Sequence, residues 1–258
     1  MLIDREKVVS SFNNYLKGYD HNDPRIGLKI AHTYRVATLC ETIANHLKFN
    51  KEEVELAWLI GMLHDVGRFD QVKRYGTFKD ADSMNHAQYG TEILFDKGYI
   101  RNYIESNCYD ELICAAILNH NLFVLPNDLD VRTRLFSDLI RDADKIDILK
   151  LSASGSLETI YGYTIEQMKQ AAITKEVIES YLEHKAVDYS LKKSPIDHVV
   201  GHVSLAFELV FPISFEIVEK QGYLNQILSF DSENEMTKIQ LMELKKDMQK
   251  YIIMRSGN

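Results

Sequence analysis

The sequence has few residues of the kinds that interrupt helices. Its 258 residues include only four prolines and twelve glycines, and no segment of any length alternates between apolar and polar residues. Such alternation is typical of half-buried strands, and prolines and glycines mark turns. Because both signals are scarce, the sequence predicts helices nearly throughout, and we expect an all-α fold.

Cysteine and long hydrophobic runs are also scarce. The three cysteines, Cys40, Cys108 and Cys114, are odd in number and lack Cys-x-x-Cys spacing, which argues against a disulfide scaffold or a thiolate metal site. No apolar run approaches the ~18 residues of a membrane span, and the N-terminus is charged from Asp4 onward. We therefore expect a cytoplasmic protein with no membrane partner.

Excess positive charge is absent as well. The formal net charge of -8 disfavours a polynucleotide partner, whereas a local basic pocket for a small phosphorylated molecule is compatible with it. The 45% apolar content supports a large core. We found no repeat and no linker, so we expect one domain over residues 1–258, with a core at about 20–150 and a C-terminal helical cover at about 151–258.

Helical periodicity places the expected elements. Apolar residues recur at helical spacing after His32, and residues 51–64 are apolar nearly all round, which predicts a central helix. Ser83 is a candidate cap for a helix carrying His86, and Ser194-Pro195 is a start signal for a helix reaching Phe211. Further helices are expected at 110–120, at 131–149 and over the last thirty residues, where Met236, Ile239, Leu244, Met248 and Ile252 recur.

Ligand-type side chains lie on or at the ends of different predicted helices, each within apolar sequence: His32, His64, Asp65, His86, His120 and Asp144. In a helical bundle these side chains can converge. Imidazole nitrogens and carboxylate oxygens suit Fe, Mn, Ni, Co or Zn, and the set contains no thiolate. A carboxylate next to a histidine ligand can bridge two ions, which makes Asp65 the bridging candidate.

The order of these motifs resembles a known family. A lone His32, then "LHDVG", then His86 in "SMNHAQYG", His120 in "AAILNHN" and Asp144 in "DADKID" is similar to the HD-domain metal-dependent phosphohydrolase superfamily in its six-ligand, dinuclear variant. The resemblance covers about residues 20–150 and implies a helical bundle with additional C-terminal helices. It implies one metal on His32, His64, Asp65 and Asp144, and a second on Asp65, His86 and His120.

The resemblance also implies cofactors and chemistry. We expect two divalent transition-metal ions, Fe or Mn first, with Ni, Co, Zn or Mg as alternatives. They would acidify a bridging water for attack on a phosphoryl group. Arg68 and Lys145 are cations close in sequence to the ligands, so we assign both to the substrate. Together with Asp65 they are the expected catalytic residues. Arg74 is a weaker third, and Tyr75–Phe78 is a candidate lid.

Two departures bear on the substrate. Arg68 stands where many members carry lysine, and its guanidinium still suits phosphate. The Gly-Tyr-Pro signature expected soon after the fourth histidine is missing, which argues against a cyclic di-GMP phosphodiesterase. The leading prediction is a phosphohydrolase of a small phosphorylated molecule such as a nucleotide or dinucleotide. A diiron oxygenase and a nucleotide- or metal-sensing module without turnover stay open, as does the oligomeric state.

The remaining histidines carry weaker expectations. His198 and His202 are spaced as a metal pair on one helix, but no nearby carboxylate pattern beyond Asp197 completes a site. We interpret the pair as core or substrate-pocket residues. Asp142 and Asp147 flank Asp144 and need not face the same site. Three further histidines in polar contexts are expected to face solvent: His21, His46 and His184.

Overall fold

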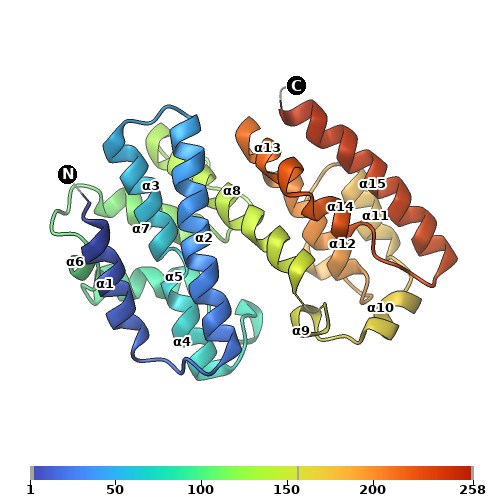
Figure 1. Ribbon diagram of the computed structural model, residues 1–258, viewed down its shortest axis with the longest axis horizontal. Helices are drawn as coiled ribbons and strands as arrows, with labels where there is room; N and C mark the ends of the chain where they lie inside the picture. The colour runs from blue at the N-terminus through green and yellow to red at the C-terminus, as the bar shows by residue number, and fades with distance from the viewer. Residues whose placement is uncertain (1–2, 156, 257–258) are drawn as a thin grey trace. The chain divides into compact units, whose positions relative to one another are not determined.

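The computed structural model describes residues 3–155 and 157–256, and within them every regular element is a helix (Figure 1). The predicted all-α fold is confirmed. The chain divides into two compact units, Met1–Ala143 and Asp144–Asn258. The division falls inside one continuous helix, α8 (Val131–Ser154), whose first half belongs to the first unit. The prediction of a single domain with a cover beginning near residue 151 stays a prediction.

The first unit is built mainly from the helices that precede α8. In chain order they are α1 (Arg5–Leu16), α2 (Pro24–His46), α3 (Lys51–Leu63), α4 (Val66–Tyr75), the 3-10 turn η1 (Asp80–Asp82), α5 (His86–Thr91), the π-helical segment η2 (Glu92–Asp96), α6 (Ile100–Tyr103) and α7 (Asp110–Asn119).

Helix α3 is the central helix of this unit, as its sequence predicted. Asn50 and Glu53 form a reciprocal capping box at its start, and every residue from Leu56 to Leu63 is buried. It packs most extensively on α2. At Gly61 the two helices approach so closely that a Cβ would lie 2.6 Å from the Cα of Ala37. Glycine at this position therefore brings α3 and α2 together.

A second close approach joins α4 to α5. A Cβ on Gly67 would lie 2.2 Å from the carbonyl oxygen of His86, so only glycine fits there without movement of the backbone. Helix α5 is capped by Asn85, whose side chain accepts hydrogen bonds from the backbone N–H groups of Ala87 and Gln88. The predicted cap at Ser83 is wrong, because Asn85 is the residue adjacent to the first helical turn.

The second unit begins with the rest of α8 and continues through α9 (Leu157–Tyr161), α10 (Ile165–Gln170), α11 (Lys175–Leu182), the 3-10 turn η3 (Tyr189–Leu191), α12 (Asp197–Val203), the 3-10 segment η4 (Ser204–Glu208), α13 (Pro212–Gln221), α14 (Tyr223–Ile227) and α15 (Glu235–Ser256). The helix predicted from Ser194-Pro195 to Phe211 is therefore shorter and begins later. The carboxylate of Asp197 accepts the backbone N–H groups of Lys193 and Ser194, which holds those residues in a turn outside the helix.

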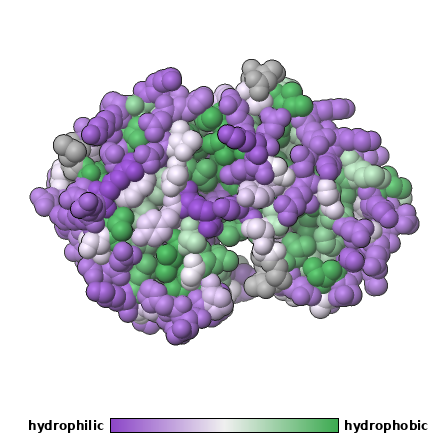
Figure 2. Space-filling view, viewed as in Figure 1, coloured by the Kyte–Doolittle hydropathy of each residue, from purple (hydrophilic) through white to green (hydrophobic). Residues whose placement is uncertain are grey.

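The closing helix α15 has the predicted place but a different buried face. Leu241, Leu244, Met248 and Ile252 are buried, whereas Met236 and Ile239 are 61% and 47% exposed. Hydrophilic side chains cover most of the face seen in Figure 2, with hydrophobic ones in smaller patches. Among the described helices, none is both long and apolar enough to cross a membrane.

Candidate metal centre

Four histidines surround the carboxylate of Asp65. Its Oδ2 lies 3.5 Å from Nε2 of His32 and 3.6 Å from Nε2 of His64. Its Oδ1 lies 3.5 Å from Nε2 of His86 and 3.8 Å from Nε2 of His120. All five side chains are buried. Each carboxylate oxygen therefore faces its own pair of imidazoles, contributed by α2 and the end of α3 on one side and by α5 and the end of α7 on the other.

Two of the imidazoles are oriented by the helices that they terminate. His64 is the C-cap of α3 and His120 the C-cap of α7. The Nδ1 of His64 lies 2.8 Å from the carbonyl oxygen of Gly61, and that of His120 lies 2.6 Å from the carbonyl oxygen of Ile117. Because a carbonyl oxygen only accepts, Nδ1 carries the hydrogen in both rings. In both rings Nε2 then faces Asp65.

His86 is oriented by a carboxylate from the preceding loop. Its Nδ1 lies 2.7 Å from Oδ2 of Asp80. Burial would raise the pKa of Asp80, but the hydrogen bond from His86 and the charge of Arg68 hold that pKa well below its usual range. Burial, with the charge of Arg68, lowers the pKa of His86 to about 3. His86 is therefore neutral at physiological pH and keeps a lone pair on Nε2.

Asp65 stays ionised although it is buried. Burial alone would raise its pKa, but the nearby Lys29 and His64 hold the pKa of this carboxyl well below its usual range. The Nζ of Lys29 lies 2.6 Å from Oδ2 of Asp65. The site thus has an ionised carboxylate surrounded by four imidazoles.

Asp144 extends the set from α8. One ligand atom from each of His32, His64 and Asp144 lies within 4.8 Å of the other two, and the same holds for His64, Asp65 and His120. Asp144 directly follows Ala143, the last residue of the first unit, in the continuous helix α8. All six residues predicted as ligands therefore belong to one neighbourhood, and their role as ligands stays a prediction.

The donor set fits a divalent cation. His86 and His120 bring two Nε2 atoms within 3.0 Å of each other. With hydrogen on both Nδ1 atoms, these are two acceptors that repel unless a proton or a cation lies between them. Two nitrogen ligands at about 2.1 Å from one ion and at right angles to each other would lie about 3.0 Å apart. The spacing of this pair is therefore compatible with two ligands of one ion.

The cations assigned to substrate have protein partners. Nη1 of Arg68 donates to Gln71, to the carbonyl oxygen of Phe78 and to Asp80, at 2.7, 2.5 and 2.8 Å. Lys145 lies 3.0 Å from Glu208. Arg74, the weaker candidate, donates to Tyr89 at 2.6 Å and is half exposed. Arg68 thus fastens the loop that follows α4, and the predicted contact of these residues with substrate stays a prediction.

The candidate lid, Tyr75–Phe78, belongs to that loop. Tyr75 is 50% exposed. The ring of Phe78 instead faces the site, with Nζ of Lys29 at 5.3 Å and the guanidinium carbon of Arg68 at 6.0 Å from its centroid. Arg25 donates to the carbonyl oxygen of Gly76 at 2.6 Å. The lid segment is therefore held by two arginines, and Phe78 is its inward-facing residue.

His198 and His202 lie in the second unit. Nδ1 of His202 lies 2.6 Å from the hydroxyl of Ser152 and 3.1 Å from that of Tyr161. Burial lowers the pKa of His202 to about 3. The ring of His198 packs among tyrosine rings. Neither residue belongs to the three-residue groups of the described chain that can hold an ion. The pair is therefore part of a polar and aromatic cluster.

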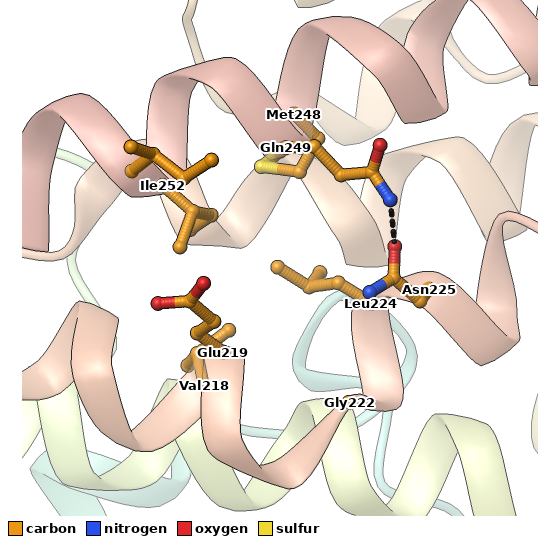
Figure 3. Close-up of a pocket in the computed structure, with 9 residues that line it drawn as sticks. Val218, Glu219, Gly222, Leu224, Asn225, Met248, Gln249 and Ile252 are labelled. Atoms are coloured by element: carbon orange, nitrogen blue, oxygen red, sulfur yellow. Dashed lines mark hydrogen bonds between the residues drawn. The ribbon is translucent and has the colours of Figure 1, made fainter.

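A hollow of about 220 Å³ lies between α13, α14 and α15, also in the second unit (Figure 3). It is lined by apolar side chains with Glu219 at one side and the hydrogen-bonded amides of Asn225 and Gln249 at the other. None of the predicted ligands or cations lines it. Its lining includes no cationic side chain to receive a phosphate.

Sequence reasoning missed two residues of the candidate metal centre. Lys29 lies one helical turn before His32, on the same face of α2, so the spacing of three residues was a usable signal. Asp80 is six residues before His86 in a loop, where no periodicity predicts which side chain turns inward. Of the histidines expected to face solvent, His21, His46 and His184 are all exposed.

These features define a class: an all-helical domain whose helix ends gather histidines around a central aspartate. Residues 30–149 match the family model of the HD domain, and this part of the chain is an HD domain. The family consists mostly of metal-dependent phosphohydrolases, and its members bind divalent metals. The predicted superfamily is therefore confirmed. No curated protein and no solved structure matched the chain.

Proposed function

We propose that this protein is a dinuclear metal-dependent phosphohydrolase that cleaves a phosphate ester or anhydride of a small molecule, with a nucleotide or dinucleotide as the favoured substrate class. The observation that carries the proposal is that the two carboxylate oxygens of Asp65 face different pairs of histidines. One carboxylate oxygen faces His32 and His64, and the other faces His86 and His120. A carboxylate between two ligand pairs is what a bridging ligand requires.

In this proposal His32, His64, Asp65 and Asp144 hold one ion, and Asp65, His86 and His120 hold the other. We expect Fe or Mn. Divalent cations bound here would acidify a water molecule and polarise a phosphoryl oxygen. The protein's own groups then have two tasks. The three imidazoles whose Nδ1 is fixed by a carbonyl oxygen or by Asp80 present Nε2 without rearrangement, and Arg68 neutralises charge beside Asp65.

A small phosphorylated substrate in the cytoplasm fits the charge of the chain better than a polynucleotide does. The formal net charge of -8 repels an extended phosphate backbone, whereas one phosphoryl group meets only the local cations beside Asp65. The expected specificity is therefore for compact phosphate esters or anhydrides.

The test uses protein purified without oxygen and loaded with Mn or Fe. It is offered a panel of nucleotides and phosphomonoesters with and without oxygen, alongside a chelator control. The proposal expects release of inorganic phosphate or a nucleoside monophosphate under strictly anaerobic conditions, abolished by the chelator. Turnover that requires oxygen and consumes it in step with substrate would instead identify an oxygenase. A fully metal-loaded protein with no turnover would indicate a sensing module.

A further inference from the structure

Lys29 is the cation in closest contact with the central carboxylate. It lies on α2 one turn before His32, its side chain is 13% exposed, and its Nζ lies 2.6 Å from Oδ2 of Asp65. A lysine rarely gives up most of its hydration without a specific partner. Lys29 is therefore held in the site by a specific contact, at the carboxylate oxygen that faces His32 and His64.

The ammonium group of Lys29 has donors to spare. It carries three N–H groups, and the contact with Asp65 uses one of them. Within residues 3–155 and 157–256, Asp65 is its one hydrogen-bond partner. The ring of Phe78 covers the group at 5.3 Å, which favours a cation without accepting a conventional hydrogen bond. Two donors thus remain for an anionic acceptor next to Asp65.

The other nearby cation is engaged differently. Nη1 of Arg68 is shared among Gln71, Phe78 and Asp80, whereas its Nε is buried, makes no hydrogen bond among the described residues and lies 3.6 Å from Oδ1 of Asp65. Lys29 and Arg68 therefore stand at opposite oxygens of Asp65. Arg68 also holds the loop that follows α4, so Lys29 has fewer hydrogen bonds to the protein than Arg68 has.

We propose that Lys29 is a catalytic residue that donates hydrogen bonds to a phosphoryl oxygen of the substrate, on the side of Asp65 that faces His32 and His64. The inference rests on the proposed function and deepens it. A carboxylate oxygen has two lone pairs, so Oδ2 can bind a cation and still accept from Lys29. The ammonium then adjoins the phosphoryl group and offsets the negative charge that grows on its oxygens.

The experiment measures binding of inorganic phosphate to Mn-loaded protein by titration calorimetry, together with metal content per chain. Lys29→Met removes the charge and keeps an unbranched side chain that is only one atom shorter. Lys79→Met is the matched control, because Lys79 is an exposed lysine of the loop that follows α4. We expect Lys29→Met to keep the wild-type metal content and to weaken phosphate binding at least about tenfold, the loss expected for a charged hydrogen bond. Lys29→Arg should recover part of the affinity, and Lys79→Met should match wild type.

Two results would overturn the inference. One is unchanged phosphate affinity in Lys29→Met with full metal content. The other is loss of metal from Lys29→Met that Lys29→Arg reverses together with phosphate binding, because Lys29 would then only support Asp65. If Lys29→Met does not fold, Lys29→Gln keeps a neutral donor to Asp65 and is judged by the same criteria. Phosphate binding needs no turnover, so a failed hydrolase assay and a failed role for Lys29 are separate outcomes.

Discussion

Asp80→Asn should selectively weaken the binding of one of the two proposed ions. The Oδ2 of Asp80 accepts from Nδ1 of His86 at 2.7 Å, while Oδ1 accepts from Arg68 and from Gln71 at 2.8 Å each. An asparagine keeps the shape of the side chain but has a single acceptor oxygen. That oxygen cannot accept from both His86 and Arg68. The variant therefore loses the hydrogen bond that orients the imidazole or the one that holds the loop.

The expected magnitude follows from the role of such carboxylates. Removing the partner that orients a histidine ligand typically costs 10- to 100-fold in metal affinity, which corresponds to about 1.4 to 2.7 kcal/mol. The loss should fall on the ion assigned to Asp65, His86 and His120. His32 and His64 have no hydrogen bond to Asp80 among the described contacts, so the other ion should keep its affinity.

The assay is metal content per chain by mass spectrometry after dialysis, combined with competition against a metal-binding dye. The control is Asp82→Asn, which makes the same charge change two residues away on an exposed side chain. We expect two ions in wild type and in Asp82→Asn, and one tightly bound ion in Asp80→Asn. Equal affinity for both ions in Asp80→Asn, or equal losses in the two variants, would refute this account of His86.

Three further predictions test other parts of the molecule. Asp65→Ala should lose both ions while His120→Ala loses mainly one, and two tight ions in Asp65→Ala would exclude a bridging role. Gly67→Ala should lower the free energy of unfolding by about 1–3 kcal/mol, because the new Cβ would meet the backbone of His86. Gly27→Ala, in open space on α2, should instead raise the free energy of unfolding by up to about 1 kcal/mol. Denaturant unfolding measures both changes. The pKa of His202 is about 3 in the folded state and about 6.5 in the unfolded state, so between these values only the unfolded state binds the proton. Wild-type stability should therefore fall as the pH drops from 6.5 toward 3, by up to about 1.4 kcal/mol per pH unit. His202→Asn removes this contribution. The free energies of unfolding of the variant and the wild type, measured at pH 7, 6 and 5, should therefore converge toward pH 5. A difference that stays constant with pH would contradict this role of His202.

Much of the fold and of the candidate site follows from local sequence patterns. The all-round apolar stretch of α3 predicted its central place because a helix without a polar face must be enclosed. The same helix ends on His64 and Asp65, which made that pair the natural centre of the site. The order of His32, His86 and His120 along the chain predicted their meeting because each belongs to a separate helix of one bundle.

The parts that escaped prediction depend on contacts distant in sequence or on competition between neighbouring caps. Asp80 becomes important only because the loop folds back onto Arg68 and His86. Asn85 rather than Ser83 caps α5, since both are good capping residues and the close approach at Gly67 fixes where α5 begins. In the second unit, the carboxylate of Asp197 accepts the backbone N–H groups of Lys193 and Ser194, which keeps Ser194 in a turn before the helix.

The ending of α3 at His64 and of α7 at His120 has an electrostatic consequence. A helix carries about half a negative charge at its C-terminus, so two helix ends add to the charge of Asp65 at the same place. Before cations bind, these negative charges favour a cation over a phosphate at the oxygens of Asp65. In the proposed function, metal would therefore bind before substrate, and a high concentration of substrate would not replace a shortage of metal. The activity of the protein would therefore follow the supply of metal first.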